Sequence, residues 1–380
     1  MKSLCRIRIR LDNLLHNLEF LRASGKPLMP VVKADAYGHG LPAVAAALSS
    51  QGVDHFCVGA VAEGVELRRS GIKGTVVALL GLSPLTRDLP VLPPTLSTLE
   101  EDARAALTHE LTPLIHDWPT LERLADLTRD RAAKSVSVAL KCDTGMARLG
   151  FLPEDMPQVL EKLACAPQLR PDLLVSHLVA ADDPDQDSFT REQAACFRDA
   201  GRCLRRAFPD IRLSLGNSAC LLAFPELAGD LARPGFALYG GNPFHGTRLD
   251  VLGLGLAPVM EAFAPILEVH PLRAGQSLGY GRGFVAPRDM TVAVAGIGYA
   301  DGFRRVPGAQ LSVKGMRAPV VGRVAMQMSC LDVTDIPAVR PGDMAYILGG
   351  EGKAIRAEEV AQWWGTIPYE VTCLLGRIER

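Results

Sequence analysis

The sequence lacks an excess of charge of either sign, and it lacks any long apolar run. Its 41 Lys and Arg residues nearly balance 42 Asp and Glu residues, for a net charge of -1 and a pI of about 6.7. Binding to nucleic acid or to an anionic membrane is therefore not expected. No stretch approaches the roughly 20 apolar residues of a membrane-spanning helix. The first residues alternate arginine with apolar residues and hold no secretory signal, so we expect a cytoplasmic protein.

Paired cysteines are also missing. The nine cysteines are scattered, odd in number and without a C-x-x-C pair, so neither a zinc site nor a disulfide framework is predicted, and no metal is expected. This usage suits a reducing compartment. With 48% hydrophobic and 22% charged residues, the composition is that of an ordinary globular protein, and 380 residues are enough for two domains.

Short apolar runs alternate with segments of helical periodicity over the first 240 residues. Eight such alternations predict a parallel (β/α)8 barrel of the TIM type for residues 1–240. Ser97-Thr98-Leu99-Glu100 has the form of a capping box and predicts a helix start. The runs expected to form barrel strands are residues 27–32, 56–61, 76–80, 114–116, 136–141, 173–177, 211–215 and 236–239.

The pattern changes after Gly240. Glycine and proline separate β-type runs, which predicts an all-β second domain over residues 241–380. The fold class expected is thus α/β, a barrel followed by a mainly β C-terminal domain. We leave open that the first strand of the chain packs on this second domain. The β-type runs are residues 260–269, 291–297, 318–325 and 331–333.

A lysine follows the first predicted barrel strand directly, in the stretch V-V-K-A-D-A-Y-G-H-G at residues 31–40. Lysine is rarely buried unless it is paired or chemically used. One interpretation is that Lys33 is a Schiff-base lysine at the barrel mouth, in a loop that closes over a ligand. The simpler interpretation of these ten residues alone is a strand-end lysine that points to solvent.

Other polar stretches follow later strands, at the end of the barrel where such folds carry their chemistry. Arg148 in K-C-D-T-G-M-A-R-L-G could clamp a carboxylate or could form an ordinary surface ion pair. His177 could be catalytic or a satisfied structural residue. Gly216-Asn217-Ser218 and Arg233-Pro234-Gly235-Phe236 could build a phosphate site, or they could be two tight turns.

The second domain contains a glycine-flanked tyrosine in G-Y-A-D-G at residues 298–302. A buried tyrosine usually only packs and finds one hydrogen bond. Tyr299 could transfer a proton if a cationic neighbour lowered its pKa. The stretches 322–326 and 368–370 are weaker signals by themselves.

Four stretches together resemble the alanine racemase family, pyridoxal-phosphate enzymes of the barrel type (fold type III). They are V-V-K-A-D-A-Y-G-H-G, K-C-D-T-G-M-A-R-L-G, R-P-G-F-A-L-Y-G and G-Y-A-D-G, in the family's order and approximate spacing from the first strand to near the C-terminus. The resemblance implies interconversion of L-alanine and D-alanine, which supplies D-alanine for peptidoglycan.

The resemblance also implies roles for individual residues. Lys33 is similar to the lysine that holds pyridoxal 5'-phosphate and acts as one base. Tyr299 is similar to the second base, delivered from the partner subunit of a head-to-tail homodimer with shared active sites. Arg233 resembles the arginine at the pyridine nitrogen, and His177 the residue that links this arginine to the tyrosine.

The remaining implied roles concern the substrate and the cofactor phosphate. Arg148, with the backbone of Met326 from the other subunit, resembles the clamp on the substrate carboxylate. Lys141 is similar to a lysine that is carbamylated in many members and braces this arginine. Cofactor-binding positions are matched by Tyr37, Asn217, Ser218, Gly235, Phe236 and Tyr369.

The chemistry of these roles is coherent. Inversion at Cα needs a base on each face, and an arginine at the pyridine nitrogen weakens the cofactor as an electron sink. A decarboxylase of the same fold is expected to place a carboxylate there. One departure is Gln327, where the family commonly has aspartate. The alternatives are a serine or broad-specificity racemase, or a non-catalytic pyridoxal-phosphate carrier, which would resemble the barrel alone.

Overall fold

Short, β-rich apolar runs build a ring of parallel strands. The computed structural model describes residues 3–85, 96–129, 135–352 and 354–378. Six strands lie in sequential order and pair in parallel. Their burial on both faces explains their continuous hydrophobic character. They are β2 (His55–Val58), β3 (Thr75–Ala78), β4 (Thr112–Ile115), β5 (Val136–Lys141), β6 (Leu169–Val175) and β7 (Arg212–Ser214).

Two short segments close the ring. Val31 bridges Cys57 of β2 in parallel, and Leu28 bridges Ala232 in parallel. The amide of Met29 donates to the carbonyl of Ala232 at 2.7 Å. The predicted parallel barrel is confirmed. Its interior is filled by apolar side chains rather than open, and these are Met29, Val31, Cys57, Val77, Leu114, Ala139, Leu173, Val175 and Leu231.

The eighth predicted strand is wrong. Residues Phe236–Tyr239 form a 3-10 helix, η4, whose side chains are all buried. The eighth strand position of the barrel is taken by the residues around Ala232, which pair with the first barrel segment. A short apolar run is compatible with either a buried strand or a buried helix. Gly240, with φ of +87°, ends η4 in the left-handed region.

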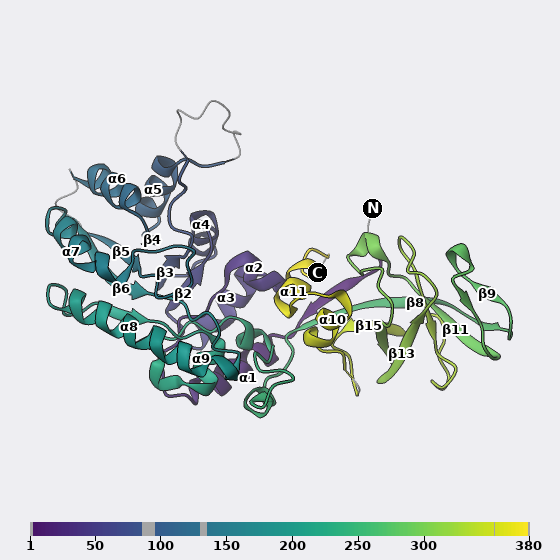
Figure 1. Ribbon diagram of the computed structural model, residues 1–380. Helices are drawn as coiled ribbons and strands as arrows, with labels where there is room; N and C mark the ends of the chain where they lie inside the picture. The colour runs from purple at the N-terminus through teal and green to yellow at the C-terminus, as the bar shows by residue number, and fades with distance from the viewer. Residues whose placement is uncertain (1–2, 86–95, 130–134, 353, 379–380) are drawn as a thin grey trace.

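Amphipathic helices surround the ring (Figure 1). In α8 the buried residues Thr190, Ala194 and Phe197 follow helical spacing. The capping box of α5 lies one residue later than the predicted residues 97–100. Thr98 and Glu101 exchange its two hydrogen bonds. The helices are α1 (Leu11–Arg22), α3 (Leu41–Ser50), α4 (Val61–Arg69), α5 (Leu99–Thr108), α6 (Trp118–Thr128), α7 (Met156–Ala164), α8 (Asp187–Arg205) and α9 (Ser218–Ala223).

An antiparallel sheet dominates the second lobe. The N-terminal strand β1 (Arg6–Ile9) joins this sheet by pairing with β8, with Arg6 opposite Phe263. The sheet order is β1-β8-β11-β14-β13-β12-β15, and β8 also pairs with β15. The other strands of this sheet are β8 (Met260–Leu272), β11 (Met290–Ala295), β12 (Gln310–Val313), β13 (Met316–Val321), β14 (Ser329–Asp332) and β15 (Met344–Leu348). A separate two-stranded sheet is formed by β9 (Ser277–Leu278) and β10 (Phe284–Val285).

The second lobe is mainly but not entirely β, which corrects the all-β expectation. Two helices, α10 (Ala357–Trp364) and α11 (Pro368–Leu375), lie between the two lobes (Figure 1). α11 packs closely on the turn after Lys33. A Cβ added to Gly376 would lie 2.3 Å from the Cα of Gly38, so neither glycine leaves room for a side chain. The contact between Gly376 and Gly38 places the end of α11 at the barrel mouth.

Candidate active site

Lys33 begins an unusual turn rather than the predicted loop. In α2 (Lys33–Gly38), the four residues from Ala34 to Tyr37 have φ of 53° to 55° and ψ of 35° to 53°, so this single turn is left-handed. None of the four is glycine. Left-handed helical backbone costs an L-residue roughly 1–2 kcal/mol. Four such residues store roughly 4–8 kcal/mol of strain, which the surrounding structure must offset.

Arg233 provides a fixed positive charge at the barrel mouth. Its guanidinium is buried and donates to the carbonyl and the hydroxyl of Ser214, each at 2.6 Å, and to the carbonyl of Ser176. These acceptors lie at the ends of β6 and β7. Sequence reasoning did not single out Ser214, whose hydroxyl also donates to the carbonyl of Leu231 at 2.7 Å.

Burial and nearby arginines shift the titratable groups at the barrel mouth in one direction. The Lys33 side chain is partly exposed, but desolvation by the surrounding protein lowers its pKa, and Arg148 lowers it further. Burial and then Arg233 lower the pKa of Lys141 to about 7 and that of His177 to about 3. At neutral pH His177 is therefore an uncharged imidazole and Lys141 is in part a free amine. Such clustered shifts are typical of functional sites.

A tight loop after β5 presents Arg148. The buried carboxylate of Asp143 accepts hydrogen bonds from the amides of Gly145, Met146 and Arg148 at 2.8–3.1 Å. Burial by itself would raise the pKa of Asp143, but these amides lower it. Asp143 is a residue that sequence reasoning missed, although an aspartate before a glycine turn was a readable signal. Within the described ranges, the Arg148 guanidinium has no hydrogen-bond or ion-pair partner and is exposed.

Aromatic and small residues gather beside Lys33 from three segments of the chain. Tyr37 lies against Gly235, where an added Cβ would be 2.5 Å from the tyrosine oxygen. The rings of Phe236 and Tyr369 stack at 4.3 Å. Burial raises the pKa of Tyr369 to about 12 and that of Tyr37 further, so both phenols stay neutral donors. The structure thus brings together these four predicted cofactor residues.

Asn217 and Ser218 organise the start of α9. The side-chain oxygen of Asn217 caps the helix by accepting from the amide of Cys220 at 3.0 Å. The hydroxyl of Ser218 accepts from the amides of Gly235 and Ala237, each at 3.1 Å. The amides of η4 and the start of α9 therefore meet at Ser218, in the place where anions bind to such barrels.

Tyr299 and Met326 lie on the second lobe, away from these groups. Tyr299 opens the 3-10 turn η7 (Tyr299–Asp301), and its side chain is 47% exposed. Met326 is 58% exposed, and its carbonyl accepts from the amide of Ala300 at 2.9 Å. A Cβ at Gly298 would lie 2.4 Å from the Met326 carbonyl oxygen, so the two loops are locked together. No contact between either residue and Lys33 appears in the described part of this single chain.

The predicted link from Arg233 through His177 to Tyr299 stays a prediction. The ring of His177 is close enough to Arg233 for the charge to affect its pKa. Among the residues that the structure describes, however, the ring has no hydrogen-bond partner. The carbonyl of His177 accepts from Gln193, at 3.4 Å.

Comparison with known proteins identifies the family. Residues 9–243 match the alanine racemase N-terminal domain, and residues 259–380 match the alanine racemase C-terminal domain. The chain belongs to the alanine racemase family. It is thus an enzyme, an isomerase of amino acids.

Individual alanine racemases match over almost their whole length. The protein of Nitratidesulfovibrio vulgaris strain Miyazaki F is 48% identical over 372 residues, which are 97% of this chain and 95% of that protein. The protein of Lawsonia intracellularis is 44% identical, over 98% of this chain and 96% of that one. The match across both domains gives no support to a carrier made of the barrel alone.

Solved alanine racemase structures share the fold. The structure from E. faecalis has a TM-score of 0.84 at 27% identity and covers 100% of this chain and 98% of that chain. The structure from Bartonella henselae, described with covalently bound pyridoxal phosphate, has a TM-score of 0.82 at 25% identity, with coverage of 100% and 99%.

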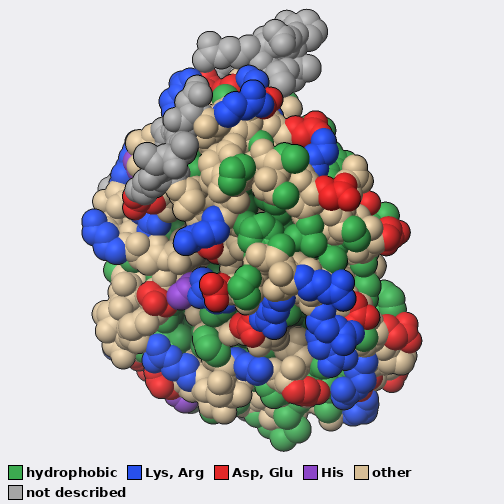
Figure 2. Space-filling model, turned by 90° about the vertical axis from the view of Figure 1, so that its left-hand side faces the viewer, with side chains coloured by type: hydrophobic (Ala, Val, Ile, Leu, Met, Phe, Trp, Pro, Cys, Tyr) green, Lys and Arg blue, Asp and Glu red, His purple; other side chains and the backbone are tan. Residues whose placement is uncertain are grey.

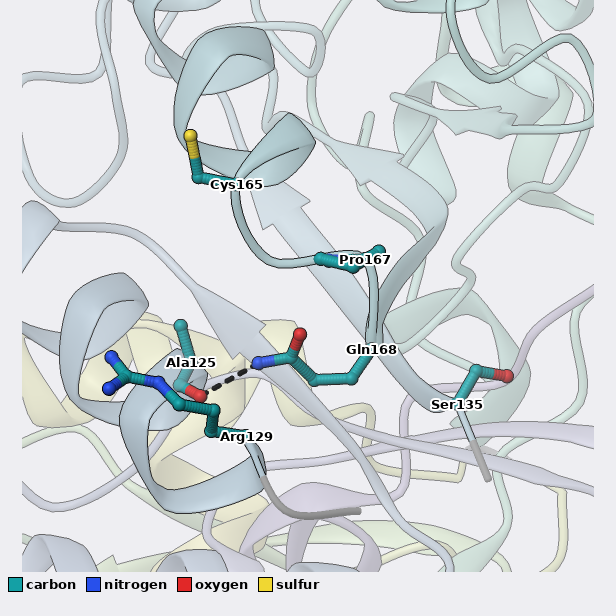
Figure 3. Close-up of a pocket in the computed structure, with 6 residues that line it drawn as sticks. All are labelled: Ala125, Arg129, Ser135, Cys165, Pro167 and Gln168. Carbon is teal, nitrogen blue, oxygen red and sulfur yellow. Dashed lines mark hydrogen bonds between the residues drawn. The ribbon is translucent and has the colours of Figure 1, made fainter. Parts of the chain in front are cut away.

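Two further surfaces of this racemase-family chain are distinct from the barrel mouth. A hollow of about 410 Å³ lies at the amino ends of β5 and β6, where the Gln168 amide donates to the Ala125 carbonyl at 2.8 Å (Figure 3). It holds none of the predicted site residues. The outer face of the α/β lobe shows both basic and acidic side chains (Figure 2). Of the helices described, none combines the length and apolarity needed to cross a bilayer.

Proposed function

We propose that this chain interconverts L-alanine and D-alanine with pyridoxal 5'-phosphate held at Lys33. The observation that carries the proposal is a lysine of lowered pKa at the barrel mouth, flanked by Arg148 and Arg233. A neutral amine can attack a carbonyl carbon and can later take a proton, whereas an ammonium can do neither. The bound cofactor would supply the π-system that delocalises the electron pair left at Cα.

The residues around Lys33 fit this cofactor. The amides at the start of α9 and η4, with the hydroxyl of Ser218, suit a phosphate group. Tyr37 and Tyr369 are neutral phenols that can donate to its oxygens. Arg233 keeps a fixed positive charge in a position suited to the pyridine nitrogen, and this charge would keep that nitrogen unprotonated. Asn217 contributes by capping α9.

Substrate binding falls to Arg148. Its guanidinium is exposed, and its loop is fixed through Asp143. A planar guanidinium binds a carboxylate through two parallel hydrogen bonds, which would orient the Cα–H bond of alanine. Lys141, with a pKa lowered to about 7, has the free-amine character that reaction with carbon dioxide requires. We propose that it is carbamylated and that the resulting anion braces Arg148.

The second base would be Tyr299 of the partner subunit in a homodimer. Within its own chain, Tyr299 is half exposed and lies beside Met326, whose backbone would help to hold the substrate carboxylate. Lys33 would then serve one face of Cα and the tyrosine the other, as inversion requires. Gln327, next to Met326, is exposed and leaves the backbone contact available. We propose that this enzyme works in the cytoplasm and supplies D-alanine for peptidoglycan.

Purified protein loaded with pyridoxal 5'-phosphate tests the proposal. We expect a visible absorbance band from the lysine-bound cofactor, and D-alanine formation from L-alanine well above turnover of L-serine and L-lysine. Equal turnover of the three amino acids would favour the broad-specificity alternative. The band without any racemisation would refute the racemase assignment. Growth of a D-alanine auxotroph that expresses the chain tests the peptidoglycan role.

A further inference from the structure

The left-handed turn after Lys33 needs an external support. None of its four left-handed residues is glycine, and the amides of Ala34 and Asp35 donate to a side chain outside the turn. At the far end of the turn, the side chain of Asp35 accepts from the amide of Leu41 at 2.7 Å. α11 packs against Gly38, where an added Cβ would lie 2.4 Å from the carbonyl oxygen of Thr372. The near end, next to Lys33, is held by a side chain from another helix.

That side chain is Glu63 of α4. One carboxylate oxygen accepts from the amide of Ala34 at 2.6 Å and lies 3.4 Å from the amide of Asp35. The other oxygen accepts from the amide of Gly59 at 2.7 Å, in the loop that follows β2. One carboxylate thus joins the turn after the first barrel segment, at Ala34, to the loop after β2, at Gly59.

Gly59 lies between this carboxylate and the stem of Lys33. A Cβ added to Gly59 would lie 2.9 Å from the Glu63 oxygen and 3.5 Å from the Cβ of Lys33. Glu63, Gly59 and the Lys33 stem therefore pack as one layer, with no room for a further side chain. Glu63 therefore holds backbone amides on both sides of the Lys33 stem, those of Ala34 and Gly59.

We propose that Glu63 is a positioning residue for the cofactor-binding amine of Lys33. Both of its oxygens accept from backbone amides, an arrangement that suits a side chain with two acceptor oxygens. A glutamine would keep one acceptor oxygen and would direct an NH2 group at a second N–H donor. The proposal rests on the proposed function, because it concerns the amine that binds the cofactor.

Glu63→Gln tests the role, with Glu66→Gln as the matched control. Glu66 lies on the same helix, but its side chain is exposed and makes no hydrogen bond within the described ranges. For Glu63→Gln we expect cofactor uptake by the cofactor-free protein, followed by the visible band, to slow about tenfold or more. We expect kcat to fall about tenfold with the KM for alanine unchanged within about twofold, and Glu66→Gln to match the parent.

A second variant separates positioning from a general loss of structure. Glycine adopts the left-handed region without strain, so Ala34→Gly reduces the support that the turn requires. We expect the double variant Ala34→Gly with Glu63→Gln to regain part of the uptake rate and kcat lost in Glu63→Gln, even if the single variant folds poorly. Parental uptake and kcat in Glu63→Gln, or no rescue in the double variant, would overturn the proposal. A parent protein without the visible band would instead refute the proposed function.

Discussion

The barrel mouth and the exposed edge of the β-rich lobe hold the two halves of the proposed site, and they differ in kind. At the mouth, burial and nearby arginines lower the pKa values of Lys33, Lys141 and His177. On the lobe, Tyr299 and Met326 are largely exposed and only their backbones are fixed. The first half has its electrostatic environment within one chain. The second half has its backbone geometry, and in the proposed homodimer its electrostatic environment would come from the partner subunit.

Removal of Lys33 would break the barrel half completely. We expect Lys33→Ala to lose the visible band and racemisation together, since no other described amine combines this position with a lowered pKa. Lys33→Arg, which keeps a long basic side chain but cannot form the covalent link, should behave in the same way. A spectrum and a D-alanine assay suffice, and measurable racemisation by Lys33→Ala would refute the assignment.

Removal of Tyr299 would break only the lobe half. We expect Tyr299→Phe to bind the cofactor normally but to racemise about 10²–10⁴-fold more slowly, the range for loss of one acid–base group. If the halves come from different chains, mixing Tyr299→Phe with Lys33→Ala should restore activity. One site of each mixed dimer would pair an intact lysine with an intact tyrosine, which gives about a quarter of the parental activity after random exchange. No recovery after verified subunit exchange would contradict shared sites.

The sequence predicted the barrel half more fully than the lobe half, and it missed what holds either half in place. Apolar runs correctly located seven of the eight barrel segments, because a buried parallel strand has a continuous hydrophobic sequence. The run at residues 236–239 was misassigned, because a buried 3-10 helix has the same signature. The left-handed turn had no signal at all, because Ala34 and Asp35 are ordinary residues held by contacts with distant α4 and α11.

The resemblance supplied roles that geometry alone would not. Nothing in the stretch G-Y-A-D-G marks Tyr299 as a base, and the single chain does not bring it to Lys33. Asp143 and Glu63 were missed for the opposite reason. Their carboxylates act on backbone amides within loops, so their importance appears only when those amides are located in space.

A change at Arg233 would alter the barrel half without dismantling it. We expect Arg233→Glu to raise side transamination relative to racemisation, because a carboxylate at the pyridine nitrogen favours its protonation and strengthens the electron sink. Arg233→Lys keeps a positive charge and serves as the control. Pyruvate formed per D-alanine formed is the measurement. Equal ratios in Arg233→Glu and the parent would contradict the weak-sink interpretation.

The smallest expected effect concerns Lys141, whose lowered pKa should make the free energy of unfolding depend on pH. Burial lowers the folded-state pKa to about 7 from the ordinary value of 10.5, so between these values the unfolded chain binds more protons than the folded one. The free energy of unfolding should therefore rise with pH from about 7 upward, and Lys141→Met should flatten this rise. Urea unfolding at several pH values above 7, in buffers free of carbon dioxide, measures the slope.

The same experiment with bicarbonate tests the proposed carbamate. The free amine is the form that reacts with carbon dioxide, so bicarbonate should stabilise the parent above pH 7 and leave Lys141→Met unchanged. A carbamate anion next to Arg148 would offset the repulsion among Lys141, Arg148 and Arg233, which explains the sign of the expected effect. Equal stabilisation of both proteins would mean that bicarbonate acts elsewhere. Lys141 would then be a buried amine whose role ends with its charge.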